Sequence, residues 1–380
     1  MKTLLIQDHL KSGGAARAGA RWLPILERVG WEVLQVAGDE KPSQGYLLTG
    51  KPQRGWGRIR EIFAGNDGRK RIVENRLGDF LLETQPDLFW FHNISGGGKW
   101  GWSEEMIRIA REHAPVLWTL HDMWALGDGD PYWAESEKAG RYESSPVRGV
   151  VNTKAEHRLV LTAPSQWLVN LASELTGSKC HFLPNPINLS IYSPGDRQQA
   201  RGRLGIKSSG LVVLAGADSL KDKRKGMDLL FEAWSEIPKE QATLALFGRN
   251  GETSEGKIYL GSIESDTQMA DVYRAADLYV HPAGQENAPC TIQESLACGT
   301  PVLAFPVGGI PEMVVPRKTG FLVARLSPES LAETLASALA DPEQLREMRE
   351  RCRKYAEEIW NPEKLMRQFT ELARELMAES

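Results

Sequence analysis

The chain has 380 residues, a formal net charge of −4 and 25% charged side chains. Its length exceeds what one hydrophobic core usually spans, so we expect two domains. The near balance of charge argues against a nucleic-acid-binding protein, and no run approaches the roughly 20 apolar residues of a membrane span. The four cysteines form no Cys-x-x-Cys pair, which indicates a reducing cytoplasm.

Short apolar runs alternate with amphipathic stretches in the first half of the chain, which is the pattern of a doubly wound parallel sheet. The expected strands are residues 4–7, 32–37, 88–92, 115–121, 159–163 and 181–184. The run from Met1 to Gln7 is too short for a signal peptide, and we interpret it as the first strand. Ligands of such sheets bind beyond the carboxyl ends of the strands, so candidate site residues are expected there.

A glycine-rich segment, residues 11–17, follows the first strand and opens a helix. Gly13 and Gly14 allow a backbone to approach a ligand closely, and a helix start attracts anions. Gly13, Gly14 and Arg17 are therefore candidates for contact with an anion such as a phosphate. The same turn would also serve as a plain connection between strand and helix.

Residues 51–76 contain eight Lys or Arg against three Asp or Glu, with Trp56, Ile59, Ile62 and Phe63 between them. A basic amphipathic stretch can lie on an anionic membrane surface, where it would suit a lipid-linked acceptor. A solvated loop and helix face is the ordinary alternative.

Two histidines end expected strands of the first half. His121 ends the strand at residues 115–121, and His92, followed by Asn93, ends the strand before it. A histidine at this position can hydrogen-bond a sugar hydroxyl or an acceptor. A buried, hydrogen-bonded structural histidine is the alternative. No His or Cys cluster in the sequence has the spacing of a zinc site.

Prolines and polar residues interrupt the alternation over residues 185–196, where we place a linker. A second alternation follows, with expected strands at residues 210–216, 244–247, 278–281 and 302–305. The predicted domains are residues 1–190 and 196–358. After a break at residues 360–362, residues 363–377 form a last amphipathic helix.

Two motifs of the second half carry the chemistry. Lys225, followed by Gly226, lies after a strand and opens a helix, where its charge can stabilise a departing diphosphate. Glu286 and Glu294 lie eight positions apart, in a loop and on a helix that starts after Pro289 and suits a phosphate. Two carboxylates beside an anion site indicate a nucleotide that bears a sugar. A charged, solvated helix start and two solvated glutamates are the alternatives.

The pair Glu286 and Glu294, followed by Gly299-Thr300-Pro301 and by Gly308-Gly309-Ile310-Pro311-Glu312, resembles the motif of the retaining glycosyltransferases of family 4. The resemblance covers nearly the whole chain and is strongest in the second half. It implies the GT-B fold, in which two Rossmann-like domains with doubly wound parallel sheets face an interdomain cleft. It also implies that the last helix, within residues 361–380, packs back on the first domain.

The resemblance assigns roles to candidate residues of both halves. Glu294 would bind the donor ribose, Glu286 the sugar and Lys225 the diphosphate. His121 would lie near the reacting sugar, and His92 would help shape the acceptor pocket. The other predicted donor contacts are the loop Asn287, Ala288, Pro289, Cys290 and Thr291, and the base-binding positions Arg249 and Ile263.

One position departs from the family pattern. An arginine usually follows the glycine that stands here as Gly216, but the next residue is Ala217. Three residues are open as replacements for this second phosphate-binding cation, namely Arg224, Lys221 and Arg249.

Asp128-Gly129-Asp130 fits the Asp-x-Asp motif of metal-dependent glycosyltransferases of the other main fold, where carboxylates hold a divalent ion. It lies in a run where Asp and Gly also favour turns. We therefore expect no metal.

The implied activity is retaining transfer of a sugar from a UDP- or GDP-sugar to a hydroxyl of a glycan or lipid-linked acceptor, in polysaccharide or glycolipid biosynthesis. No cofactor is expected. The alternatives are a catalytically silent sugar-binding scaffold and a nucleotide-sugar epimerase on the same fold. The expected location is the cytoplasm, with peripheral contact to the inner membrane face as an option.

Overall fold

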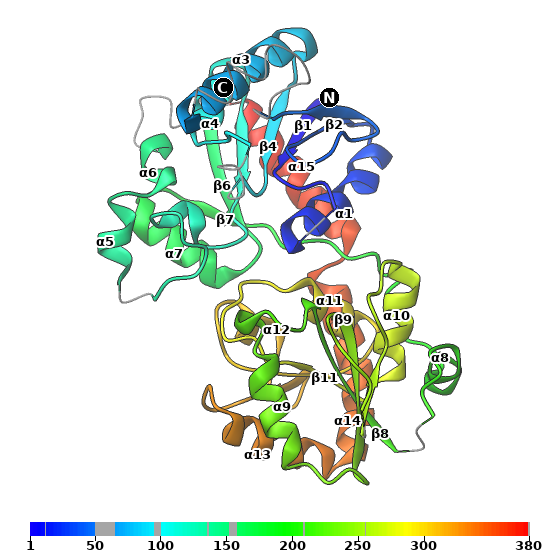
Figure 1. The fold of residues 1–380 in the computed structure, drawn as a ribbon. Coiled ribbons are helices and arrows are strands. Elements are labelled where there is room, and N and C mark those ends of the chain that lie inside the picture. The colour runs from blue at the N-terminus through cyan, green and yellow to red at the C-terminus, as the bar shows by residue number, and fades with distance from the viewer. Residues whose placement is uncertain are drawn as a thin grey trace. The chain divides into compact units, whose positions relative to one another are not determined.

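The computed structural model describes residues 1–11, 13–49, 65–94, 100–134, 137–151, 158–207, 210–254 and 256–378. The chain divides into two compact units (Figure 1). Unit 1 comprises Met1–Pro186 and Pro362–Ser380, and unit 2 comprises Ile187–Asn361. The first division lies before the predicted boundary at residue 190 because Ile187 and Tyr192 are fully buried in the core of unit 2.

The described part of unit 1 contains a parallel sheet of seven strands in the order β3-β2-β1-β4-β5-β6-β7. The strands are β1 (Lys2–Gln7), β2 (Glu32–Ala37), β3 (Gly45–Leu47), β4 (Leu88–Phe91), β5 (Val116–Thr119), β6 (Leu159–Ala163) and β7 (Cys180–Phe182). Six strands were expected and are confirmed. The sequence missed β3, which has three half-buried residues and therefore no apolar pattern.

Both faces of this sheet are covered, which explains its continuous apolar runs. Leu4 and Ile6 of β1 belong to one hydrophobic cluster, whereas Leu5 between them belongs to another. Successive side chains of a strand point to opposite faces, so both clusters draw on the same strands.

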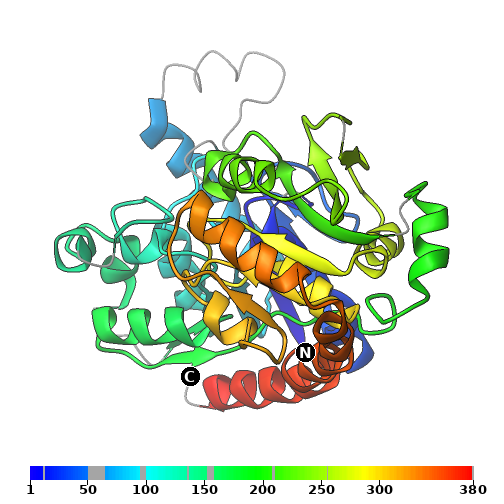
Figure 2. The same ribbon diagram turned by 90° about the horizontal axis from the view of Figure 1, so that it is seen from below.

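The described residues of unit 1 form the helices α1 (Gly14–Arg28), α3 (Gly65–Thr84), α4 (Glu105–His113), α5 (Lys138–Tyr142), α6 (Pro146–Val151), α7 (Gln166–Thr176) and α15 (Pro362–Ala378), with a 3-10 turn η2 (Trp124–Leu126). The last helix, α15, lies against α1 and is drawn in red beside the blue N-terminal segment (Figure 2). Its buried Phe369 stacks on Trp90 of β4 with 4.5 Å between the ring centroids. The end of the chain thus completes the core of unit 1.

The described part of unit 2 contains a parallel sheet of six strands in the order β10-β9-β8-β11-β12-β13. The strands are β8 (Leu211–Ser219), β9 (Ala242–Arg249), β10 (Lys257–Tyr259), β11 (Leu278–His281), β12 (Val302–Ala304) and β13 (Gly320–Leu322). The four expected strands are confirmed. The sequence missed β10 and β13, which are three residues long and largely half-buried.

The helices of unit 2 are α8 (Arg197–Arg203), α9 (Met227–Ser235), α10 (Asp266–Ala275), α11 (Cys290–Ala297), α12 (Ile310–Met313), α13 (Pro328–Leu339) and α14 (Pro342–Ile359), with a 3-10 turn η5 (Lys223–Lys225). Their ends follow local rules of capping. The side chains of Ser327 and Asp341 accept backbone hydrogen bonds at the starts of α13 and α14, and a proline follows each of them.

Within the described ranges, no helix is both long and apolar enough to span a bilayer. The basic stretch that was predicted to contact a membrane, residues 51–76, lies outside the described residues up to residue 64, and its remainder forms the start of α3. Membrane contact therefore stays a prediction.

Candidate functional site

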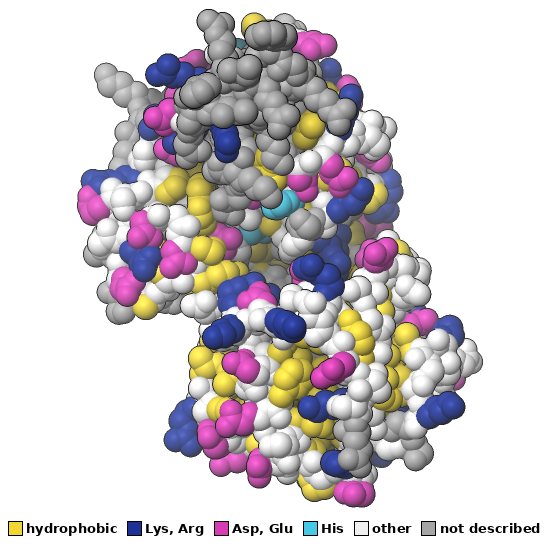
Figure 3. Space-filling model, viewed as in Figure 1, with side chains coloured by type: hydrophobic (Ala, Val, Ile, Leu, Met, Phe, Trp, Pro, Cys, Tyr) yellow, Lys and Arg dark blue, Asp and Glu magenta, His cyan; other side chains and the backbone are white. Residues whose placement is uncertain are grey.

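The candidate donor residues of unit 2 meet at Glu286, in the loop between β11 and α11. Lys225 contacts Glu286 Oε1 through Nζ, and Arg224 Nη1 lies 3.3 Å from the same oxygen. Arg224 also donates a hydrogen bond to the carbonyl of Gln285 at 3.0 Å. Figure 3 shows Lys and Arg side chains gathered on unit 2 near the start of α9. Two adjacent cations thus converge on one buried carboxylate.

The charge of Glu286 is set by two opposing effects. Burial, which leaves only 7% of the residue exposed, raises the pKa of its carboxyl group. Lys225, then His281 and then Arg224 lower the pKa through their charges, and together they outweigh burial. The net pKa lies below the usual value, so Glu286 is ionised at neutral pH.

Two glycines hold the segments of this site together. Gly226 has φ +65°, and a Cβ there would lie 1.9 Å from the carbonyl oxygen of Pro282. Gly308 has φ +52°, and its Cβ would lie 1.9 Å from the carbonyl oxygen of Glu286. Only glycine permits both the backbone conformation and the close approach. The Lys-Gly pair and the Gly-Gly-Ile-Pro-Glu turn are therefore explained by packing around the Glu286 loop.

The second carboxylate, Glu294, lies one helix turn into α11 and has no exposed surface. Its Oε2 accepts a hydrogen bond of 2.9 Å from the buried hydroxyl of Tyr273. The start of α11 carries no acidic residue in its first turn, which favours an anion there.

The loop before α11 contains the other predicted donor contacts. Asn287 is buried, and its carbonyl accepts a hydrogen bond of 3.1 Å from the backbone of Gly309. Ala288 is half-buried against the core of unit 2, and Pro289 caps α11 ahead of Cys290. Thr291 Oγ1 lies 3.5 Å from His281 Nδ1.

The candidates for the second cation separate in the structure. Arg224 is next to Lys225 at Glu286, whereas the exposed Arg249 is paired with Asp218 and Lys221 is exposed. Gly216 is buried against the ring of Phe247. A Cβ at this position would lie 2.4 Å from that ring.

Ile263, the predicted base-binding position, packs against the core of unit 2 in the loop after β10. Nothing in its surroundings distinguishes one nucleotide base from another.

In unit 1, His92 and His121 form a pair that the sequence did not predict. His92 Nδ1 lies 2.8 Å from His121 Nε2, and the two rings are stacked with 5.1 Å between their centroids. Burial lowers the pKa of His121 to about 4, and burial together with the neighbouring His121 lowers the pKa of His92. Both imidazoles are therefore neutral at pH 7. The only sequence signal for this contact was that both residues follow adjacent strands.

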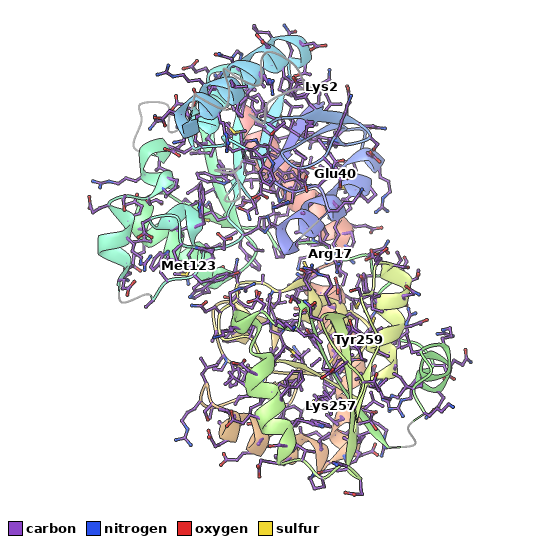
Figure 4. The ribbon with its side chains drawn as sticks, in the orientation of Figure 1. Lys2, Arg17, Glu40, Met123, Lys257 and Tyr259 are labelled. Atoms are coloured by element: carbon purple, nitrogen blue, oxygen red, sulfur yellow. The ribbon has the colours of Figure 1, made fainter. Side chains whose placement is uncertain are left out.

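The other predicted residues of unit 1 lie at the same carboxyl edge of the sheet. The carbonyl of Asn93 accepts a hydrogen bond of 2.8 Å from the backbone of Asp8, which follows β1. Gly13 has φ +91° before the start of α1 at Gly14. Arg17 lies near that start (Figure 4). The role of this glycine loop in acceptor or phosphate binding stays a prediction.

The Asp-x-Asp segment is occupied by an internal cation. Arg141 Nη1 lies 2.7 Å from Asp128 and 3.5 Å from Asp130, and Asp130 also accepts a backbone hydrogen bond from Tyr132. A divalent ion would compete with this guanidinium. Among the residues that the structure describes, no group of three or more His, Cys, Asp or Glu side chains could hold a metal ion.

Residues 219–359 match the family model described as glycosyl transferases group 1. This range begins at the end of β8 and contains Lys225, Glu286 and Glu294. Residues 219–359 form a glycosyl transferases group 1 domain. The group 1 domain thus contains the whole cluster of cations and carboxylates described above.

Curated relatives of the group 1 domain and of the full chain are similar in sequence. A D-inositol 3-phosphate glycosyltransferase of Segniliparus rotundus is 33% identical over 187 residues, which are 45% of this chain and 41% of the relative. A D-inositol 3-phosphate glycosyltransferase of Xylanimonas cellulosilytica is 29% identical over 309 residues, 73% of this chain and 70% of the relative. The chain spans about half the length or less of the first relatives it matches.

Solved structures confirm the predicted GT-B fold with its two parallel-sheet domains. Sucrose-phosphate synthase from Thermosynechococcus elongatus has a TM-score of 0.78 at 22% identity and covers 100% of both chains. The Anabaena protein HepE in complex with UDP-glucose has a TM-score of 0.73 at 17% identity, covering 98% of this chain and 99% of HepE.

Proposed function

We propose that this protein is a retaining glycosyltransferase of family 4 that transfers a sugar from a nucleotide-diphosphate sugar to an acceptor hydroxyl. The observation that carries the proposal is the convergence of Lys225 and Arg224 on the buried Glu286. A pair of cations beside a carboxylate suits a diphosphate next to a sugar. The match to the group 1 family and the glycosyltransferase relatives support it.

In this proposal each residue of unit 2 has one task. Lys225 and Arg224 bind the diphosphate, and Arg224 replaces the arginine missing after Gly216. Glu286 holds hydroxyl groups of the sugar, and Glu294 binds the ribose. These contacts orient the donor and stabilise the charge that develops on the diphosphate.

The reaction then needs no dedicated protein base. The bond between the sugar's anomeric carbon and the diphosphate oxygen breaks, and the acceptor oxygen bonds to that carbon. The acceptor's proton passes to a phosphate oxygen of the leaving diphosphate. Because the two cations supply positive charge at the diphosphate, we propose that no metal ion takes part.

The residues of unit 1 are proposed to serve the acceptor side. His121 offers a neutral imidazole for a sugar or acceptor hydroxyl, and the glycine loop at Gly13 and Gly14 belongs to the same unit. The proposed acceptor is a glycan or lipid-linked glycan. Because HepE was solved with UDP-glucose, a UDP-sugar is the first donor to test.

Slow hydrolysis of the donor tests this function without knowledge of the acceptor. The purified protein, in the presence of a chelator, is incubated with UDP-, GDP- and ADP-sugars, and the released sugar is followed by proton NMR. We expect sugar to be released from the donors of one nucleotide class. The anomer that appears first should have the same anomeric configuration as the donor. Release of the opposite anomer would refute retention, and hydrolysis only with added Mg²⁺ would refute the metal-free mechanism. No hydrolysis and no nucleotide binding would favour the silent scaffold.

A further inference from the structure

His281 is the last residue of β11 and lies close to Glu286. The sequence assigned it no role. The residue is 4% exposed. Its Nδ1 faces two hydroxyl groups, at 3.2 Å from Tyr279 and 3.5 Å from Thr291. Its Nε2 is buried without a hydrogen-bond partner among the described residues and lies 3.8 Å from Glu286 Oε1.

This environment fixes the position of the imidazole proton. Both hydroxyl groups can donate to Nδ1, which then carries a lone pair. With the proton on Nδ1 instead, the lone pair of Nε2 would face the carboxylate of Glu286 and be repelled. Nε2 therefore carries the proton, and this buried N–H group has a carboxylate oxygen 3.8 Å away, just beyond hydrogen-bond distance. Buried N–H groups without a partner are rare, so this one calls for an explanation.

The charges around Glu286 supply that explanation. In the structure Lys225 and Arg224 neutralise its buried carboxylate. A diphosphate carries more negative charge than one carboxylate and would draw both cations toward itself. Glu286 would then be a buried carboxylate that has lost its partners, which is strongly unfavourable unless another donor replaces them.

We propose that His281 is a positioning residue that donates a hydrogen bond from Nε2 to Glu286 when Lys225 and Arg224 turn to a bound diphosphate. A movement of about 1 Å closes the gap to a normal hydrogen bond. Glu286 then stays ionised and in place beside the sugar. The ligand-driven step rests on the proposed function, whereas the response of His281 to the loss of Lys225 does not.

The first test removes the lysine instead of adding a ligand. The full-length Lys225→Met variant is labelled with ¹⁵N-histidine, and the imidazole resonances of His281, assigned with His281→Gln, are compared with those of the wild type. We expect the Nε2 proton of His281 to move downfield, as it does when a hydrogen bond to a carboxylate forms. The control is Lys354→Met on α14, which removes a lysine paired with Glu350 at 2.6 Å. An unchanged His281 resonance in Lys225→Met would overturn the proposal.

The second test adds UDP, GDP or ADP to the labelled wild type, with binding followed independently by calorimetry. A nucleotide that binds and shifts the His281 Nε2 proton downfield supports the proposal. A nucleotide that binds without this shift overturns it. If none of the nucleotides binds, the proposed function fails, while the Lys225→Met result still decides whether His281 replaces the lysine. The two failures are therefore distinguishable.

The third test separates positioning from a purely structural role. His281→Phe keeps a planar ring but removes the N–H, whereas His281→Gln keeps an N–H donor close to the position of Nε2. We expect donor turnover to fall about tenfold in His281→Phe and to be largely retained in His281→Gln, because one hydrogen bond is lost only in the former. Nucleotide affinity should stay within about twofold in both variants. Equal losses of turnover in the two variants would contradict the positioning role.

Discussion

The two units hold their candidate residues in different ways. In unit 2 the candidate residues belong to short motifs, although Lys225 and Glu286 are 61 positions apart. Gly226 and Gly308 bring two short segments against the loop that contains Pro282 and Glu286. In unit 1 the paired His92 and His121 are 29 positions apart and follow two neighbouring strands, β4 and β5. The candidate residues of unit 2 therefore lie in short motifs whose glycines are required by backbone packing. The candidate residues of unit 1 are single residues at the carboxyl ends of strands.

This difference bears on which step of the proposed reaction each unit would affect. A motif held by glycine contacts to backbone atoms leaves little freedom, which suits the proposed diphosphate sugar. Side chains at the ends of separate strands can change one at a time without disturbing the sheet. We therefore expect variants of the unit 2 cluster to affect every donor reaction, and variants of unit 1 to affect the acceptor step more narrowly.

The largest effect is expected from Lys225→Met. Loss of the charge at the departing diphosphate should lower the rate of donor turnover by about 100- to 1000-fold, the usual result of removing one charge-stabilising donor. The measurement is hydrolysis or transfer with the best donor of the panel. Lys354→Met should leave the rate unchanged, and a similar loss in both variants would show that general charge, rather than the position of Lys225, matters.

Gly226→Ala tests the backbone contact that holds the cluster. A Cβ at this position meets the carbonyl oxygen of Pro282 at 1.9 Å, and φ is +65°. The free energy of unfolding should fall by about 3 kcal/mol or more, from the left-handed backbone and the overlap together. Denaturant unfolding of the full chain measures it.

Gly205→Ala is the matched control for this prediction. Gly205 has φ +68°, but a Cβ there would meet nothing within 4 Å. It should lose only about 1 kcal/mol, the cost of the backbone conformation alone. Equal losses in the two variants would contradict the close contact of Gly226 with Pro282.

His92→Phe tests the histidine pair of unit 1. The phenyl ring keeps the tilted contact with Trp90 and the stacking on His121 but removes the hydrogen bond of 2.8 Å to His121. Transfer to an acceptor should fall about tenfold, the effect of one lost hydrogen bond, while donor hydrolysis changes less. An equal loss in both reactions would show that the pair serves the donor rather than the acceptor.

The smallest effect concerns pH and His281. Burial lowers the pKa of His281 to about 4, below its ordinary value of 6.5. Between these two pH values the unfolded chain binds a proton that the folded chain does not, so stability falls as the pH falls from 6.5 to 4. His281→Gln removes this contribution.

The unfolding free energy of His281→Gln should therefore depend on pH less steeply than that of the wild type, by about 1 kcal/mol per pH unit within this window. Above pH 7 the two curves should run parallel, which serves as the internal control. Identical slopes below pH 6.5 would mean that His281 is already protonated in the folded protein.

Much of unit 2 could be predicted from the sequence because its signals are local. Continuous apolar runs identified β11 and β12, and the helix start after Pro289 placed Glu286 in a loop and Glu294 on α11. The convergence of Arg224 on Glu286 could not be predicted, because it depends on how the 3-10 turn η5 folds against the next loop.

The remaining misses have the same physical origin. The strands β3, β10 and β13 are short and largely half-buried, so they show no hydrophobic period. The contact between His92 and His121 depends on strand order, which local patterns do not encode. The lack of a hydrogen-bond partner for His281 Nε2 among the described residues could not be predicted, because it depends on every neighbour of the ring.

The central claim is that unit 2 binds a nucleotide diphosphate through Lys225 and Arg224 without a metal ion. Calorimetric titration of the full chain with UDP, GDP and ADP in the presence of a chelator tests it most directly, with Lys225→Met and Lys354→Met measured alongside. The account predicts that one nucleotide binds the wild type and Lys354→Met equally and binds Lys225→Met at least about tenfold more weakly. Equal affinity in all three proteins, or binding that appears only after Mg²⁺ is added, would contradict it.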